Sequence, residues 1–442
     1  MAEYISRRSL LQSAGAGIWL GAQSSPAQPA KTQSRGADHI DVEWYRKALA
    51  EGAERTLTTM VSPNGFLGRV GTSGQRGGSP TGKGAGTPNS QGGRSGYWPT
   101  GMGGDGTPNN HGRTLFVLAA GYELTKKPEF LEALTKAADF MLNCYRDKQY
   151  GGLFAVVDSE GKVLDDRKES YGTALAIVGM SHAAQVSGRK AYGDAALEIW
   201  SDMKRGLRDE HGFFKRETSR DFKVVSPGKN TQNPMMHLFE ALLALHDATQ
   251  SKVVFQDAEA HANNVLTHLL QKPGYIPELY DRGWKPIPAG PPGQKEPEGY
   301  PLDVYNSYSA AAQTGHIEIG HQIEWAFFLS RAVEKGFPRK YLSFAERLLG
   351  YAMKVGYDRQ TGGVFGYSDY DGKPTAASAT RGWQQVEFMK MLMNWAILRG
   401  RQDLWEPYDK ALAALKNSGP LPTDYHGCGM YVEALRLAAL KA

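Results

Sequence analysis

Asp147-Lys148-Gln149-Tyr150-Gly151-Gly152-Leu153-Phe154 returns in the second half of the chain as Asp358-Arg359-Gln360-Thr361-Gly362-Gly363-Val364-Phe365. A weaker third copy reads Asp209-Glu210-His211-Gly212-Phe213-Phe214. Each copy follows the second of two predicted helices, and its glycines permit a tight reversal into a short β-ribbon. A unit of helix, turn, helix and ribbon that recurs at roughly sixty residues predicts about six helical hairpins.

Hairpins that repeat in this way can form either a closed ring or an open solenoid. An open solenoid needs atypical polar repeats at its ends, and the chain lacks them, which favours the ring. We therefore predict an all-α (α/α)6 barrel whose inner helices line a central cavity. Apolar periodicity places a first helix at 41–61 and later helices near 113–125, 129–145, 170–187, 190–207, 234–249, 253–271, 319–335, 339–355, 383–399, 402–416 and from 427 onward.

The composition of the 442 residues is that of a globular protein with a large core, since 41% are hydrophobic and 22% are charged. It excludes disordered, collagen-like and coiled-coil proteins. The 51 basic and 46 acidic side chains give a net charge of +5 without long runs of one sign, so no basic stripe marks a nucleic-acid partner. Cys144 and Cys428 are the only cysteines, which excludes a disulfide framework and a cysteine-ligated zinc site.

The first thirty residues are predicted to be an export signal. Ser6-Arg7-Arg8-Ser9-Leu10-Leu11 precedes a short, weakly apolar stretch and then small residues near Ala30, as in a twin-arginine (Tat) signal. The alternative is an ordinary amphipathic helix with two surface arginines. We expect residues 1–30 to be removed and residues 31–442 to form one catalytic domain in the periplasm or outside the cell. No membrane association is expected after cleavage, because the apolar stretch is too short to span a bilayer.

Residues 62–112 interrupt the helical pattern with seventeen of the 52 glycines in the chain. Such a stretch buries too little apolar surface to offset the entropy lost on ordering. One interpretation is a surface insertion. The other is a loop over an active site, which is favoured by Tyr97-Trp98-Pro99 shortly before the next helix.

The polar residues that stand out on the apolar helices share one position, the start of the first helix in each pair. They are Arg113, Tyr171, His237, His321 with Glu324, Trp383 with Glu387, and His426. If these helices form the inner ring, all six positions open onto the same end of the barrel. Residues with unrelated structural roles would have no reason to keep this phase, so we predict that they form the functional site.

Two of these histidines begin His-x-x-Glu pairs, whose i, i+3 spacing puts both side chains on one helical face. In the pair of His321 and Glu324, the carboxylate can bind substrate hydroxyls or orient the imidazole, whose ordinary pKa of ~6.5 suits reversible proton transfer. Glu240, three residues after His237, falls in an apolar helix body and is interpreted as structural. Di-metal centres need more inward carboxylates than these, and nucleotide-binding glycine signatures are missing, so we predict neither metal nor cofactor.

Most of the other histidines are interpreted as structural, because they lie within helical runs or at the end of the glycine-rich segment. They are His111, His182, His246, His261 and His268. His316, five residues before His321, is a candidate for a second polar lining residue.

Four motifs of the chain resemble those of the N-acylglucosamine 2-epimerase superfamily. They are Asn233-Pro-Met-Met-His237-Leu-Phe-Glu240, Gly320-His321-Gln-Ile-Glu324-Trp325, Trp383-x-Gln385-x-Glu387 and Tyr425-His426. The superfamily contains N-acylglucosamine and cellobiose 2-epimerases, mannose isomerases and sulfoquinovose isomerases. The resemblance extends from about Arg113 to the C-terminus, and it implies the (α/α)6 barrel already predicted from the repeats.

The resemblance also implies roles for individual residues. Two histidines of such enzymes, which align with His321 and His426, exchange protons at C1 and C2 of an opened sugar through a cis-enediol. A third, here His237, contacts the sugar and assists ring opening. An arginine, here Arg113, binds the oxygen that becomes negative, because a guanidinium is a donor that stays charged. We also assign to substrate binding Tyr171, Asn233, Glu324 and Trp383.

The chain departs from the pattern of the family at three places. A single Trp383 follows Gly382 where the family has paired tryptophans, and Met235 stands where cellobiose epimerases have a histidine. Gly427-Cys428-Gly429 occupies the region in which the family often has an arginine. The residues implied in proton transfer are intact, so the differences bear on the sugar and on the reaction type.

Three functions are compatible with this sequence. The first is a cofactor-independent sugar epimerase or aldose–ketose isomerase that acts on a small sugar or a short oligosaccharide. The second is a glycoside hydrolase or polysaccharide lyase on the same barrel, with Glu324 and Glu387, or Asp105, as the facing carboxylates. The third is a non-catalytic carbohydrate-binding protein, an alternative that the nine tryptophans support. Two histidines in ring phase favour the first, since simple binding does not require imidazoles.

Overall fold

The computed structural model describes residues 39–68, 106–225, 229–289, 315–374 and 382–440. The predicted export signal at 1–30 lies outside these residues. So does the 69–105 part of the glycine-rich segment, with Tyr97-Trp98-Pro99 and Asp105. Within the described ranges, the chain forms α-helical hairpins joined by short β-ribbons.

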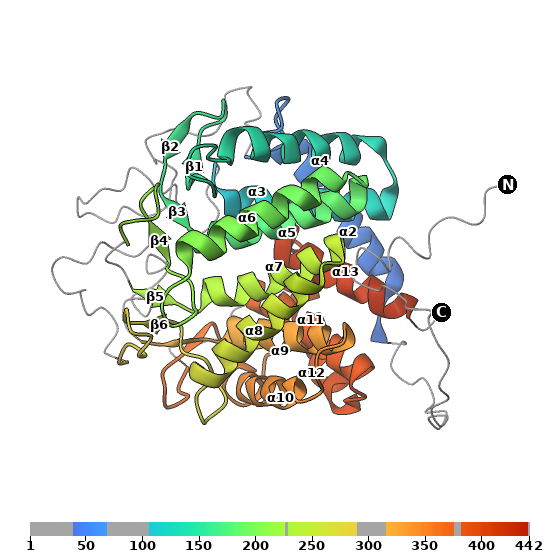
Figure 1. The fold of residues 1–442 in the computed structure, drawn as a ribbon. Helices are drawn as coiled ribbons and strands as arrows, with labels where there is room; N and C mark the ends of the chain where they lie inside the picture. Colours follow the sequence, from blue (N-terminus) through green and yellow to red (C-terminus); the bar gives the residue numbers. More distant parts are fainter. Residues whose placement is uncertain (1–38, 69–105, 226–228, 290–314, 375–381, 441–442) are drawn as a thin grey trace, which may run out of the picture.

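The helices form an inner and an outer layer (Figure 1). The inner helices are α3 (Pro108–Thr125), α5 (Ser170–Ser187), α7 (Asn233–Thr249), α9 (Ile319–Glu334), α11 (Trp383–Leu398) and α13 (Tyr425–Ala439). The outer helices are α2 (Val42–Met60), α4 (Pro128–Phe140), α6 (Lys190–Leu207), α8 (Lys252–His268), α10 (Tyr341–Tyr351) and α12 (Trp405–Lys416). Inner α5 is buried almost throughout, whereas outer α6 buries one face, because an apolar helix needs cover on all sides and an amphipathic helix on one. No helix of the described ranges combines the length and the apolar character that crossing a membrane requires.

The inner helices form a closed ring. Each inner helix packs against the next one along the chain, and α13 packs against both α3 and α2. The first and last helices of the described chain therefore make the sixth hairpin together. The predicted (α/α)6 barrel is confirmed, and the alternative of an open solenoid is wrong.

Two inner helices begin two or more residues before their predicted starts. α3 begins at Pro108, where the Thr107 side chain caps the helix, so the last residues of the predicted glycine-rich segment 62–112 are helical. α13 begins at Tyr425 rather than near 427, and the Asp424 side chain caps it. Caps and prolines fix the first turn of a helix, whereas apolar periodicity becomes visible only further inside it.

Short antiparallel β-ribbons gather at one end of the helices (Figure 1). The pairs are β1 (Val156–Val157) with β2 (Val163–Asp165), β3 (Lys168–Glu169) with β4 (Glu217–Thr218), β5 (Asn230–Thr231) with β6 (Leu279–Tyr280), and β7 (Ile317–Glu318) with β8 (Tyr367–Ser368). β3, β5 and β7 lead into α5, α7 and α9. These inner helices therefore all begin at the end of the barrel that carries the ribbons, which we call the ribbon end.

The repeated glycine motifs form the tight reversals predicted from the sequence. The Gly151 amide donates to the Asp147 carbonyl at 2.9 Å, and the Gly362 amide donates to the Asp358 carbonyl at 2.8 Å. The φ angles of Gly151 and Gly362 are 81° and 75°, a region that residues with a Cβ rarely adopt. Each reversal follows an outer helix that ends in a π-helical turn, at Met141–Tyr145 after α4 and at Ala352–Gly356 after α10. The two copies in the sequence are therefore also copies in structure.

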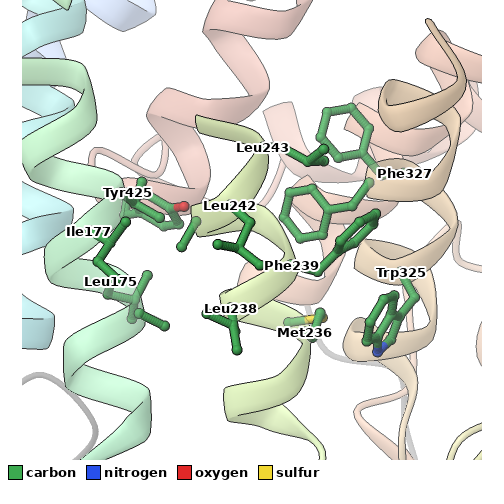
Figure 2. Packing of buried hydrophobic residues seen from close by; sticks show 14 of the residues in the cluster. Leu175, Ile177, Met236, Leu238, Phe239, Leu242, Leu243, Trp325, Phe327 and Tyr425 are labelled. Carbon is green, nitrogen blue, oxygen red and sulfur yellow. The ribbon is translucent and has the colours of Figure 1, made fainter. Parts of the chain in front are cut away.

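The spacing between inner helices is set by the side chains at each contact. Between α3 and α5 it is small, because a Cβ on Gly112 would lie only 2.1 Å from the Leu175 carbonyl oxygen, and one on Gly179 only 2.5 Å from that of Gly112. Between α7 and α9, large rings fill the space, and Phe239 stacks on Trp325 with centroids 5.4 Å apart (Figure 2). Close packing of unequal side chains thus shapes the ring helix by helix.

The close approach of α3 and α5 makes Gly112 intolerant of a side chain. We expect Gly112→Ala to lower the free energy of unfolding by about 1–3 kcal/mol, because the added methyl group overlaps backbone atoms that cannot rotate away. Gly350→Ala in α10 is the matched control, since nothing lies within 4 Å of its Cβ position, and it should be neutral or stabilising. Urea unfolding of both variants measures the difference, and equal midpoints would contradict the packing described.

Candidate active site

The first inner helices place a cation beside aromatic rings. Arg113 on α3 donates from Nη2 to the Tyr171 hydroxyl of α5 at 2.7 Å. Its guanidinium carbon lies 5.7 Å from the centroid of the Tyr171 ring and 5.2 Å from that of Tyr425 on α13. The Tyr171 ring lies 5.3 Å from the imidazole of His237 on α7. Four of the six inner helices therefore contribute to one cluster.

The indole of Trp383 on α11 joins the remaining helices to this cluster. Its ring centroid lies 5.6 Å from the imidazole of His321 on α9 and 5.1 Å from the imidazole of His426 on α13. The two imidazoles are therefore no farther apart than these two distances combined. A Cβ on Gly320 would lie 2.2 Å from the indole, so only glycine lets the ring approach α9 this closely.

His321 has the most acidic surroundings of the three imidazoles. Its Nδ1 lies 2.6 Å from Oε2 of Glu278. The carboxylate of Glu278 also accepts hydrogen bonds from the side chains of Thr231 and Gln232, just before α7. Burial alone would lower the pKa of His321, but the charge of the hydrogen-bonded Glu278, together with that of Glu318, outweighs burial and raises it to about 9. His321 is therefore an imidazolium at neutral pH.

His237, in contrast to His321, is held as a neutral imidazole. Its Nδ1 lies 2.8 Å from Oε2 of Glu240, one turn along α7, and the other oxygen of Glu240 accepts from the Tyr425 hydroxyl. Burial outweighs the attraction of Glu240 and lowers the pKa of His237 to about 4, so this imidazole is neutral. Glu240, interpreted from the sequence as structural, thus contacts two residues of the cluster.

His426 lies beside two carboxyl groups and a buried ammonium. Its Nδ1 is 3.0 Å from Oε1 of Glu387 and 4.0 Å from Oε1 of Glu324. Lys390, one turn after Glu387 on α11, contacts the other Glu387 oxygen. Burial would raise the pKa of both carboxyl groups, but Lys390 and His426 hold that of Glu387 low, whereas the charge of Glu387 raises that of Glu324 further. Glu387 is therefore ionised and Glu324 protonated.

Three of these side chains are close enough together to hold a metal ion. Glu324, Glu387 and His426 each offer one ligand atom, and these atoms lie within 4.8 Å of one another. Lys390 already supplies positive charge against Glu387, and His426 turns Nδ1 toward the same carboxylate. We therefore interpret the group as an ion-pair cluster rather than as a set of metal ligands.

The His-x-x-Glu spacing identified only one of the three histidine–carboxylate pairs. His237 does pair with Glu240, but His321 pairs with Glu278 rather than with Glu324, its partner by spacing. Glu278 was missed, as was Lys390. Each is a lone charge in an apolar stretch, between Pro277 and Leu279 and between Met389 and Met391, and a lone charge of this kind was the available signal.

The remaining predicted residues lie around or away from this cluster. Asn233 is buried at the first position of α7, four residues before His237. His111 and His261 are buried, each with Nε2 within 2.8 Å of a backbone carbonyl oxygen, and burial lowers the pKa of both to about 4. Both imidazoles hydrogen-bond to backbone carbonyl groups, in agreement with their structural interpretation. His316 is buried just before β7, edge-on to a tyrosine ring.

Known proteins match both the sequence and the fold. The N-acylglucosamine 2-epimerase (GlcNAc 2-epimerase) family matches residues 104–420. A D-mannose isomerase of Marinomonas mediterranea is 27% identical over 58% of this chain and 62% of its own length. A cellobiose 2-epimerase of Ruminococcus albus is 28% identical over 33% of this chain and 39% of its own length. The chain thus aligns with less than two thirds of the length of either relative.

The fold has a counterpart among solved structures. The crystal structure of a D-mannose isomerase superposes with a TM-score of 0.68, covers 93% of this chain and 100% of its own, and is 21% identical in sequence. At this level of sequence identity, the superposition supports the barrel fold but gives no evidence about the chemistry at the ribbon end.

Glu278 is the group that keeps His321 protonated, and this can be measured by NMR titration of the imidazole. We expect Glu278→Gln to lower the pKa of His321 from about 9, because a neutral amide does not stabilise the imidazolium. The raised pKa stabilises the folded state at low pH, and this contribution is lost as the pH rises from ~6.5 through about 9, so the variant should lose that pH dependence. Glu198→Gln, at an exposed carboxylate on α6, should change neither quantity.

Proposed function

We propose that this chain, which belongs to the N-acylglucosamine 2-epimerase family, is a sugar epimerase or aldose–ketose isomerase that moves protons between histidines and an opened sugar. One observation carries the proposal, a set of three histidine–carboxylate pairs at the ribbon end: His237 with Glu240, His321 with Glu278, and His426 with Glu387. In each pair the carboxylate contacts Nδ1, which leaves Nε2 as the nitrogen for the substrate.

His321 and His426 have different roles in this reaction. His426, with a proton on Nδ1, presents Nε2 as the general base that removes the proton from C2 of the open aldose. His321, protonated beside Glu278, is the general acid. Delivery of its proton to the opposite face of C2 gives the epimer. Delivery of a proton to C1, after a proton has passed from O2 to O1, gives the ketose.

Arg113 is placed to stabilise the negative oxygen of the enediolate. Its guanidinium stays charged at any working pH, and it keeps donors besides the Nη2 that binds Tyr171. A donor held in place before the reaction costs no reorganisation when charge develops on O1. Trp383, between the two imidazoles, offers an aromatic face to the sugar ring, and the protonated Glu324 offers a hydrogen-bond donor.

The hydrolase alternative fits this geometry less well. A glycoside hydrolase needs two carboxyl groups that face the scissile bond. Glu387 is fully buried, and its two oxygens contact His426 and Lys390. To act on a glycosidic bond, Glu387 would have to break both contacts, whereas proton transfer by the histidines leaves both in place.

The proposed substrate is a small reducing sugar or a short oligosaccharide. The relatives named above support this class, since one is a mannose isomerase and the other a cellobiose epimerase. No cofactor is needed, because both protons are exchanged with side chains. We further propose that the twin-arginine segment at 1–30 directs export to the periplasm or beyond, in keeping with Arg7 and Arg8 before a short apolar stretch.

The two histidines can be tested separately by solvent exchange. Incubation with mannose, N-acetylglucosamine or cellobiose in D2O should place deuterium at C2 of at least one sugar. His321→Asn and His426→Asn should each reduce kcat by about 10²–10⁴-fold, and loss of the base at His426 should abolish the exchange. His268→Asn, at an exposed histidine of α8, should leave both unchanged. Near-normal exchange in both site variants would contradict the mechanism.

The export proposal has its own test. Replacing Arg7 and Arg8 with lysines should leave the protein folded in the cytoplasm, since a Tat signal is read through its paired arginines. Fractionation of cells that produce the unchanged and the substituted chains measures the result. Normal export of the lysine variant would show that the segment is not a Tat signal.

A further inference from the structure

Lys390 is a buried ammonium that the mechanism above does not use. It lies in the middle of α11, its side chain is 7% exposed, and it contacts Glu387 one turn earlier. The ammonium also lies 4.6 Å from the centroid of the Phe327 ring. A lysine in such a place costs free energy unless its charge is compensated, and here the compensating groups belong to the candidate active site.

The charges around Lys390 come from four inner helices. Glu387 on its own helix, Glu324 on α9 and Glu240 on α7 all attract the ammonium. Arg113 on α3 also attracts Glu324 and Glu240 electrostatically. Three carboxyl groups thus share two permanent cations, and a proton on Glu324 balances the charge. The imidazole of His426 on α13 completes the group.

We propose that Lys390 is a positioning residue for His426, and this rests on the function proposed above. Its ammonium keeps Glu387 ionised, and the carboxylate then accepts the proton of His426 Nδ1. Without Lys390, the buried Glu387 would take up a proton from solvent and donate a hydrogen bond to Nδ1. The Nδ1 proton of His426 would leave to solvent, Nε2 would carry the one proton of the neutral ring, and the imidazole could no longer accept a proton from C2.

The structure also shows where a replacement cation could come from. Gly429 lies one turn after His426 on α13, and a Cβ built there would be 3.8 Å from Lys390 Nζ, an ordinary contact distance. A side chain that begins at Gly429 would therefore enter the space next to the ammonium. Gly429→Arg should supply the charge from the neighbouring helix when Lys390 is changed.

Four variants test the proposal: Lys390→Met, Lys390→Arg, Lys390→Met with Gly429→Arg, and Lys335→Met. The last is the matched control, because Lys335 is also a buried lysine paired with a carboxylate, Asp247, and it lies at the opposite end of α9 from His321. The rate of C2 deuteration is measured against pH for each variant. The tautomer of His426 is read from its ring nitrogens by long-range ¹H–¹⁵N NMR of the protein without sugar.

Lys390→Met should lower kcat at least about tenfold with little change in KM, as expected for a group that acts through another. The acidic limb of its pH profile should move to higher pH, because Glu387 then protonates more readily, and the His426 proton should move from Nδ1 toward Nε2. Lys390→Arg and the double variant should restore the limb and the tautomer. Lys335→Met should change neither.

Two results would overturn the proposal. One is a Lys390→Met variant with lower stability but with the pH profile and the His426 tautomer of the unchanged protein. The other is a folded double variant in which the acidic limb of the pH profile and the His426 tautomer stay displaced. This second result decides the question if Lys390→Met does not fold. A failure of the proposed function is a separate outcome, in which the unchanged protein deuterates no sugar. The NMR measurement still decides the role of Lys390 in that case, because it needs no turnover.

Discussion

The contact of α13 with α3 closes the ring, and the contacts that Tyr425 makes with the residues of the first inner helices depend on it. Closure brings Tyr425, near the end of the chain, against Arg113 and Glu240, which belong to helices much earlier in the sequence. In an open solenoid, the first and last hairpins would be the most distant parts of the molecule. Because the inner helices begin at the ribbon end, closure also makes one polar cluster out of six separate helix starts.

Within that cluster, a shared hydrogen-bonding pattern gives different charge states. His237 and His321 each place Nδ1 on a glutamate, yet burial leaves the first neutral while the charges of Glu278 and Glu318 hold the second as an imidazolium. The difference comes from the number of acidic groups nearby and not from the hydrogen bond itself. Such a contrast is what an acid and a neutral sugar-binding group need if both work at one pH.

The same principle applies to the carboxyl groups of α9 and α11. Glu324 and Glu387 are both buried beside His426, but only Glu387 contacts the ammonium of Lys390, so one carboxyl is neutral and the other is charged. A single cation thus separates a hydrogen-bond donor from a hydrogen-bond acceptor. The cluster keeps its charges balanced without an added ion, which is why several ionisable groups can be buried together.

The repeat, the glycine reversals and the phase of the polar residues could all be predicted from the amino-acid sequence. These follow from local rules, since helical periodicity and the φ angles open to glycine depend on neighbours along the chain. The sequence was also sufficient to recognise the family, because the motifs around His237, His321 and His426 are short contiguous stretches of the chain. The pairing of each carboxylate with its imidazole, in contrast, became visible only in the folded chain. Glu278 lies 43 residues from His321, and Glu387 lies 39 residues from His426. Partners so far apart meet only through the rotation and spacing of packed helices. That packing depends on side-chain volumes across the interface, as at Gly320 against Trp383. The spacing of residues along the chain does not predict it.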